Sequence, residues 1–154
     1  MFNRFARDAR AVVTNAVGIA RELGAPRVEA EHLLLAVARD DCPAARAMDA
    51  HGLDYDGLAA ALERETERSL AAVGVAAEAG PFSPPVEEPR FATSAKLALE
   101  RALRAAVARR DRRIACAHVA LGVLRAEVGT VPRALRIAGV DRAEFSDAIA
   151  ATLA

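Results

Sequence analysis

The chain contains a segment that is apolar on every side. It spans Val28–Arg39, VEAEHLLLAVAR, and its run LLLAV leaves no polar face. A surface helix carries an apolar stripe on one side only, whereas a helix that is apolar all round is buried. The segment therefore predicts a short buried helix at Glu31–Arg39. A similar segment, IACAHVALGVLR at Ile114–Arg125, predicts a second buried helix at Ala117–Arg125.

An offset of 86 residues relates these two segments, because His118 follows His32 by that distance. The same offset joins further residues of one type: Phe5 with Phe91, Ala9 with Ala95, Ala16 with Ala102 and Leu35 with Leu121. After one inserted residue, further matches are Gly52 with Gly139 and Asp54 with Asp141. Self-similarity at a fixed spacing indicates repeated supersecondary units. We therefore predict a tandem repeat of two helical units, each centred on a buried helix.

Six more helices follow from apolar periodicity and from residues that start or stop helices. Steps of three and four residues between apolar positions are typical of amphipathic helices, and proline or aspartate marks other helix starts. Asp40 and Asp41 are candidate caps for the helix that begins at Pro43. In chain order, these helices are predicted at 3–23, 43–52, 55–70, 94–110, 132–139 and after Asp141.

The predicted fold is all-α, a double four-helix tandem repeat whose eight helices have pseudo-two-fold symmetry. No stretch shows the alternation of apolar and polar residues that is typical of a strand. Residues 71–89 are rich in glycine and proline, which predicts a linker. The first repeat is then 1–70 and the second is 90–154, and a length of 154 residues suits one compact domain overall.

Charge is unevenly spread, although the net charge of the whole chain is zero. Residues 90–154 carry eleven Arg and one Lys against six acidic residues, so this half is basic. A nucleic-acid-associated regulator is therefore an alternative function. Asp111 interrupts the cluster of arginines, and no aromatic residues accompany it to stack on bases. These two features argue against nucleic acid.

The sequence offers no constellation of catalytic residues, so we predict that the protein is not an enzyme and needs no cofactor. Neither GxSxG nor HExxH occurs, and Cys42 and Cys116 lack the CxxC spacing of redox or zinc motifs. We expect both thiols to stay reduced. The N-terminus has no apolar signal core and no run approaches the ~20 residues that span a bilayer. We therefore expect a cytoplasmic protein with no membrane contact.

His32 and His118 are repeat equivalents, and each opens a buried helix. A metal site would need further ligands close by, and the sequence shows no such cluster. We predict a structural role for both histidines, as side chains that bond a loop carbonyl or a helix end and fix the turn. No metal site is predicted.

Several motifs resemble the N-terminal domain of Clp-type AAA+ unfoldases, the C-type in particular. They are MFNRFARDARAVV, EHLLLAV, the helix that ends in HGLD, and FATSAKLALERAL in the second half. The resemblance covers nearly the whole chain outside the linker. It implies a double four-helix docking module of the Clp chaperone and protease system. Such a module receives peptides, substrates and adaptor proteins for ATPase rings, which this chain lacks.

The resemblance also implies a ligand surface between the starts of the two long helices, where cyclic peptide antibiotics bind in the family. The matching positions are Phe2, Arg10, Val13, Phe91, Lys96 and Glu100. We expect the repeat symmetry to bring the two helix starts together into one apolar patch with flanking charges. The alternative is that Phe2 and Phe91 only close the ends of their helices. As a docking module, the protein would be an adaptor, competitor or decoy of a Clp unfoldase.

Some C-type domains also bind phosphoarginine through the Glu of a Thr-Glu-His motif in each half. Here the first half keeps Glu31 but has Ala30 in place of Thr. The second half has Cys116 and Ala117 in place of Thr and Glu. A guanidinium without a carboxylate loses a charge-assisted bidentate pair. Glu31 is therefore the one residual anchor, and we expect no phosphoarginine binding in the second half.

We predict that the protein neither binds nor hydrolyses ATP. The phosphate-binding sequence GxxxxGK[ST] is missing, and the only lysine, Lys96, lies on a predicted helix rather than after a glycine-rich loop. Isothermal titration calorimetry with Mg-ATP should show no heat of binding. Micromolar affinity for the nucleotide would contradict this prediction.

Overall fold

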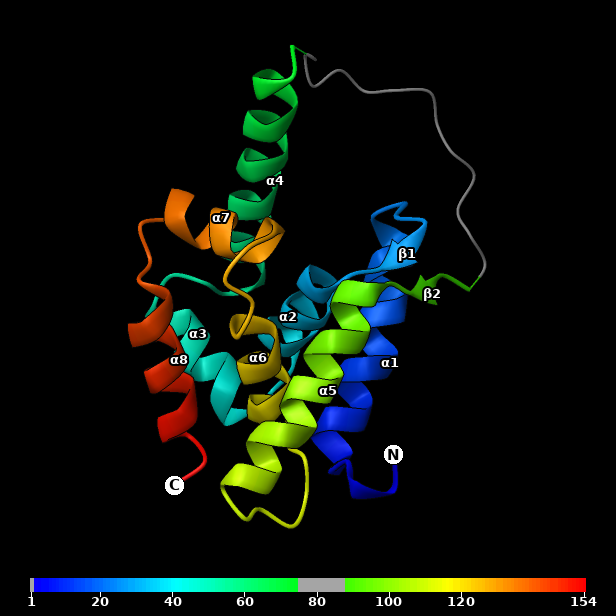
Figure 1. Cartoon of the computed structure of the whole chain (residues 1–154), viewed down its shortest axis with the longest axis vertical. Coiled ribbons are helices and arrows are strands. Elements are labelled where there is room, and N and C mark those ends of the chain that lie inside the picture. The colour runs from blue at the N-terminus through cyan, green and yellow to red at the C-terminus, as the bar shows by residue number, and fades with distance from the viewer. Residues whose placement is uncertain (1, 75–87) are drawn as a thin grey trace.

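The computed structural model of the chain is a bundle of helices (Figure 1). The structure describes residues 2–74 and 88–154, and for Phe2 it describes the backbone alone. The first repeat holds a 3-10 turn at Phe2–Arg4, α1 (Arg7–Glu22), β1 (Arg27–Val28), α2 (Ala30–Arg39), α3 (Pro43–Ala50) and α4 (Tyr55–Ala72). The second holds β2 (Arg90–Phe91), α5 (Thr93–Ala108), α6 (Cys116–Leu124), α7 (Thr130–Ile137) and α8 (Arg142–Ala151).

The two sets of four helices confirm the all-α double repeat. α5 begins and ends 86 residues after α1, and α7 begins and ends 87 residues after α3. The single inserted residue of the sequence comparison therefore lies between α6 and α7. The fourth helices differ in length, because α4 has 18 residues and α8 has 10.

The helix ends correct two details of the sequence-based prediction. The first helix begins at Arg7 rather than Asn3, because Asn3 lies in the 3-10 turn. Neither Asp40 nor Asp41 caps α3, whose N-cap is Cys42. The predicted caps of α4 and α8 are present, since the carboxylates of Asp54 and Asp141 accept backbone N–H groups at 2.9 and 3.0 Å.

Short parallel pairings hold the ends of the long helices, although the sequence predicts no strand. In one pairing β1 lies beside β2, with Val28 opposite Phe91. In the other, Phe5 forms an isolated bridge with Ile114. The offset of 86 residues converts one pairing into the other, so the two are related by the pseudo-two-fold symmetry.

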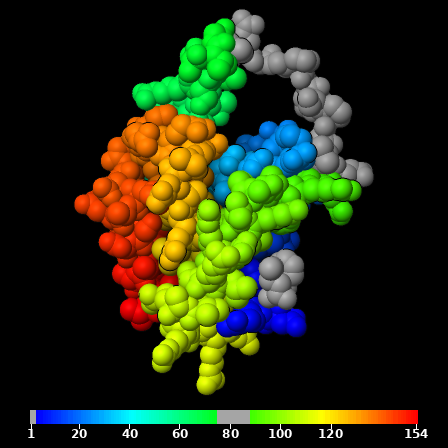
Figure 2. Space-filling model, viewed as in Figure 1, coloured from blue at the N-terminus to red at the C-terminus, as the bar shows by residue number. Residues whose placement is uncertain are grey.

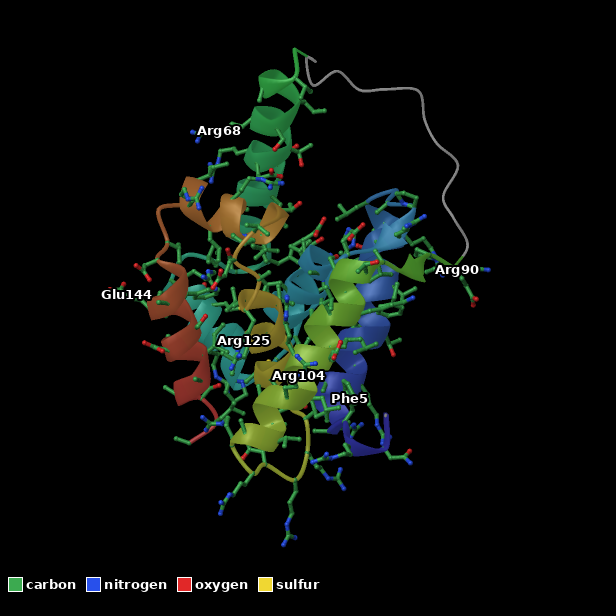
Figure 3. The ribbon with its side chains drawn as sticks, viewed as in Figure 1. Phe5, Arg68, Arg90, Arg104, Arg125 and Glu144 are labelled. Carbon is green, nitrogen blue, oxygen red and sulfur yellow. The ribbon has the colours of Figure 1, made fainter. Side chains whose placement is uncertain are left out.

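These pairings overturn the expectation that the starts of the two long helices meet. The start of α1 lies against the segment before α6, and the start of α5 lies against the segment before α2. The two helices run in opposite directions, and Figure 3 shows Phe5 and Arg90 at opposite ends of the helical layer. A two-fold axis between antiparallel elements places equivalent ends far apart, by about 24 Å for a helix of 16 residues.

The core is organised around α2 and α6, which pack on one another and on the long helices α1 and α5. The repeats are also interlocked, because α4 of the first packs on α7 of the second, and α3 packs on α8. The Arg133 guanidinium on α7 donates to the buried Glu65 carboxylate on α4 at 2.8 Å. Within the described part of the chain, no helix is both long and apolar enough to cross a membrane.

Gly122 on α6 allows this helix to approach α5 closely. A Cβ atom at this position would lie 2.1 Å from the Ala98 carbonyl oxygen and 2.8 Å from the Ala102 nitrogen, both backbone atoms of α5. Backbone atoms of a packed helix cannot move aside as easily as the end of a flexible side chain. The contact therefore requires glycine, although glycine is otherwise unfavourable inside a helix.

We predict that Gly122→Ala lowers the free energy of unfolding by about 1–3 kcal/mol, as overpacking does. Urea denaturation would measure the change. Gly18→Ala in α1 is the matched control, because a Cβ atom there would meet nothing within 4 Å. The control should stabilise the protein by roughly 0.4–1 kcal/mol through the reduced freedom of the unfolded chain. Equal effects of both substitutions would contradict the proposed close contact.

Candidate peptide-docking surface

A groove lies where the start of α5 meets the start of α2 and the segment that joins α6 to α7. We call it the α5–α7 groove, and its volume is about 440 Å³. Figure 2 shows α5 and the α6–α7 segment side by side on one face of the molecule. Its lining includes Glu31, Ser94, Leu97, Arg101, Val128 and Val131.

Exposed apolar side chains border the α5–α7 groove. Leu97 is 40% exposed and Val128 is 85% exposed, although both are large aliphatic residues. Glu29, Glu31 and Glu127 place three carboxylates on the lining against the single positive charge of Arg101. An apolar hollow with a few charged groups at its edge suits a peptide that places an aliphatic or aromatic side chain in it.

Ser94 joins the two helix starts at the floor of the groove. Its hydroxyl donates to the Glu29 carboxylate at 2.5 Å and accepts the backbone N–H of Ala30 at 2.9 Å. The first residues of α2 are thereby fixed to the first turn of α5. The groove is therefore built by both repeats, with a defined width at its base.

Glu31 lies between two hollows. It lines the α5–α7 groove and also a second hollow of about 610 Å³ between α2 and α4. Burial raises the pKa of the Glu31 carboxyl, and the carboxylates of Glu29 and Glu65 raise it further, against a backbone hydrogen bond that lowers it. A cation bound there would be favoured by the negative charges around it.

The structure separates the site residues that the sequence grouped together. Phe91 lies in the strand before α5, Lys96 in the first turn of α5 and Glu100 near its middle, whereas Arg10 lies in the first turn of α1. Since the helix starts are at opposite ends, a ligand that contacts Arg10 and Lys96 must extend along the helices. The side chain of Phe2 lies outside the described residues.

The side chains of these site residues differ in exposure. Arg10, Lys96 and Glu100 are exposed, and Phe91 is half-buried against the core. Val13 is only 9% exposed and belongs to the core, so it offers little surface to a ligand. Arg104 donates to the Glu100 carboxylate at 2.6 Å across one helical turn. Leu97, Arg101 and Val128 were missed by the sequence analysis, because the two segments that carry them are far apart in the chain.

His32 and His118, which occupy equivalent positions in the two repeats, cap their helices in the same way. The Nδ1 atoms of His32 and His118 accept the backbone N–H groups of Glu29 and Ala115, each at 2.8 Å. In His118 the other ring nitrogen contacts the Asp111 carboxylate at 2.8 Å, and this bond lowers the pKa of Asp111. These contacts support the structural role predicted for both imidazoles, and neither lines the α5–α7 groove.

The geometry defines a double helical repeat with a surface groove. A family model described as Clp repeat (R) N-terminal domain matches residues 4–88, which is more than half of the chain. The chain therefore belongs to this family. The match covers the first repeat and most of the predicted linker at 71–89, of which residues 75–87 lie outside the described residues. The offset of 86 residues relates the second repeat to the first. No curated protein matches the sequence.

Solved structures show the same fold over nearly the whole chain. The N-terminal domain of the caseinolytic protease associated chaperone ClpD from Arabidopsis thaliana is 21% identical, with a TM-score of 0.71, over 99% of this chain and 96% of that one. The Hsp104 N-terminal domain from Candida albicans is 18% identical, with a TM-score of 0.68, over 94% and 88%. A protein from structural work on a malarial protein secretion system is 17% identical, with a TM-score of 0.65, over 97% and 92%.

We predict that His32→Ala lowers the free energy of unfolding by ~1–3 kcal/mol, because it leaves the backbone N–H of Glu29 without its acceptor. Burial lowers the pKa of His32 from its ordinary value of 6.5, against the Glu29 charge that raises it. The unfolded chain therefore takes up the proton first, and the folded protein loses stability as the pH falls below 6.5.

His32→Asn is the matched control for this prediction, because its amide oxygen can accept the same N–H group but does not titrate. Its unfolding free energy should fall less than that of His32→Ala, and its stability should depend less on pH between 7 and 5 than the wild type. Urea denaturation at several pH values measures both quantities. A wild type whose stability is flat across this range would show that the burial of His32 has no energetic effect on folding.

Proposed function

We propose that the protein is a non-catalytic docking module that binds peptide segments of substrate or adaptor proteins. The single observation that carries the proposal is the α5–α7 groove, an apolar hollow with exposed aliphatic side chains on a domain of the Clp repeat family. Members of this fold among the solved structures are N-terminal domains of ClpD and Hsp104. A docking role requires no active site, in agreement with the sequence.

The chemistry of the groove favours one class of ligand. Leu97 and Val128 offer apolar contact area, while the carboxylates of the lining outnumber its one cation, Arg101. A peptide with an aliphatic or aromatic anchor residue next to a basic residue would satisfy both. The apolar anchor supplies most of the affinity, because buried side chains dominate interface energies and exposed charges are well screened.

Phe91, Lys96 and Glu100 form a separate candidate ligand surface, because Lys96 and Glu100 lie on a different side of α5 from Leu97 and Arg101, which line the groove. In this proposal Phe2 and Arg10 of the first repeat extend that surface, and the buried Val13 supports it from the core. Cyclic peptide antibiotics of the kind that target C-type Clp domains are candidate ligands. The protein partner would be a Clp unfoldase, for which the module is an adaptor, competitor or decoy in the cytoplasm.

A nucleic-acid-associated role is the alternative, and the positions of the arginines weaken it. Arg104 is paired with Glu100 at 2.6 Å, and Arg109 is paired with Asp111 at 3.2 Å. The large apolar residues that are exposed in the described part of the chain are all aliphatic, so none provides a stacking surface for bases. The positive charge of this half is therefore partly neutralised and lacks the features of a nucleic-acid site.

We predict that Leu97→Ala weakens binding of a labelled cyclic peptide antibiotic by about 10-fold or more, as for a truncated anchor contact. Phe91→Ala should weaken it by about 2 kcal/mol or more, and Lys96→Ala by less than either, because an exposed charge contributes little. Fluorescence anisotropy titrations measure the affinity. Circular dichroism confirms folding of each variant.

Val107→Ala is the matched control, because Val107 is an exposed aliphatic residue of the same helix, 54% exposed and three turns from Leu97. It should bind the peptide as tightly as the wild type. Equal affinity of Leu97→Ala and Val107→Ala would place the ligand elsewhere. Binding of labelled duplex DNA that weakens steeply with salt, without any peptide binding, would favour the nucleic-acid role.

A further inference from the structure

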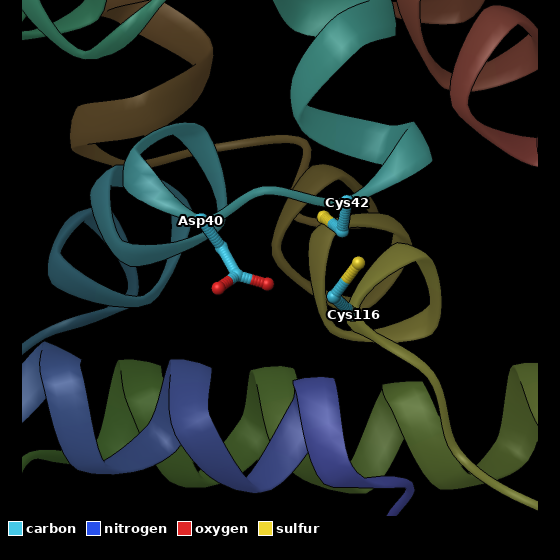
Figure 4. Close-up of side chains that lie close together, drawn as sticks. All are labelled: Asp40, Cys42 and Cys116. Carbon is cyan, nitrogen blue, oxygen red and sulfur yellow. The ribbon is translucent and has the colours of Figure 1, made fainter.

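Three potential metal ligands meet at the junction of the two repeats, away from the α5–α7 groove. Cys42 is the N-cap of α3, Cys116 is the first residue of α6, and Asp40 ends α2. Figure 4 shows both thiols and the carboxylate directed towards one small space. Both sulfur atoms and one Asp40 oxygen lie within 4.8 Å of one another, although the cysteines are 74 residues apart in the sequence.

The cluster is enclosed by protein. Cys42 is 3% exposed and Cys116 is 1% exposed, and Asp40 is half-buried. Three helices, α2 and α3 from the first repeat and α6 from the second, therefore supply two thiols and one carboxylate to one position.

The donor set is one that zinc prefers. Zn²⁺ binds thiolate sulfur at about 2.3 Å and carboxylate oxygen at about 2.0–2.2 Å in a tetrahedron, which separates the ligand atoms by roughly 3.5–3.8 Å. Atoms that already lie within 4.8 Å of one another reach this spacing through small side-chain rotations. Thiolates also discriminate against Mg²⁺ and Ca²⁺, which take oxygen ligands. Two thiolates balance the charge of a divalent cation, and the Asp40 carboxylate supplies a third ligand.

We propose that Asp40, Cys42 and Cys116 bind a Zn²⁺ ion as three protein ligands of a tetrahedral site. Binding releases the two thiol protons to solvent and forms two zinc–sulfur bonds. A water molecule would take the fourth position. The ion would join α2 and α3 of the first repeat to α6 of the second.

Cobalt provides the direct test, because Co²⁺ occupies zinc sites and has a visible spectrum. Titration of the reduced full chain with Co²⁺ should give the intense ligand-field bands of tetrahedral coordination and a near-ultraviolet thiolate-to-cobalt charge-transfer band. Zn²⁺ should bleach both at one equivalent per chain. Zn²⁺ should also raise the melting temperature of the protein, since the ion binds the folded state only.

Variants separate this site from binding elsewhere. Cys42→Ser and Cys116→Ser should each lose the charge-transfer intensity, and the affinity should fall by about 100-fold or more, since outer-shell partners alone contribute about 10–100-fold. Asp40→Asn should weaken binding while it keeps both sulfur ligands. Asp41→Asn is the matched control, because Asp41 is the exposed neighbour that pairs with Arg46, and it should bind as the wild type does.

Three outcomes would overturn the proposal. Cobalt without a charge-transfer band would show that the thiols are not ligands. Equal affinity in wild type and the cysteine variants, with loss of binding in His51→Ala, would show an adventitious ion only, because His51 is an exposed histidine. A disulfide between Cys42 and Cys116 in protein purified without reductant, with no cobalt spectrum after reduction, would show a redox pair instead. If circular dichroism shows that a cysteine variant does not fold, cobalt binding by a folded Asp40→Asn variant still tests the proposal, because its affinity should be lower than that of the wild type.

Discussion

The burial of two short helices is the constraint on which the rest of the structure depends. α2 and α6 have apolar side chains on all sides, so they must be covered by other helices on every face. A buried helix also leaves its first N–H groups without water, and an unsatisfied buried donor costs about 1–3 kcal/mol. At the two equivalent helix starts, the Nδ1 atoms of His32 and His118 accept such N–H groups. The same buried backbone donor and the same histidine acceptor therefore occur in both repeats.

The way in which the helices are covered ties the repeats to one another. α4 packs on α7 and α3 packs on α8, so neither set of four helices is enclosed by its own members alone. The Glu65–Arg133 ion pair and the Ser94 hydroxyl both join one repeat to the other. Local symmetry in the sequence thus leads to a single core, and the surface grooves form where elements of different repeats meet. This explains why the α5–α7 groove takes residues from α2, α5 and the α6–α7 segment.

The two repeats also differ where function is concerned. The groove beside α2 keeps the acidic Glu31 and the Glu29–Ser94 contact. At the equivalent start of α6, Ala117 and Ala115 replace the two acidic residues, and Cys116 meets Cys42 and Asp40 instead. The same architectural position therefore offers an open, partly charged groove in one half and a cluster of two thiols and one carboxylate in the other. A duplicated framework can thus present different side chains at equivalent positions without a change of fold.

The sequence by itself determined the helices, their order and their repetition, because these follow from local periodicity, capping residues and a fixed offset. The family resemblance rests on such local motifs, and it too was visible before the structure. Tertiary structure alone decided which residues meet. The symmetry of the sequence was compatible with helix starts that converge, yet antiparallel packing placed them at opposite ends. Likewise, Cys42 and Cys116 appear isolated in the sequence, and Leu97 and Val128 lie 31 residues apart. Contacts between distant segments depend on how helices pack, and a pattern of single residues along the chain contains no record of that packing.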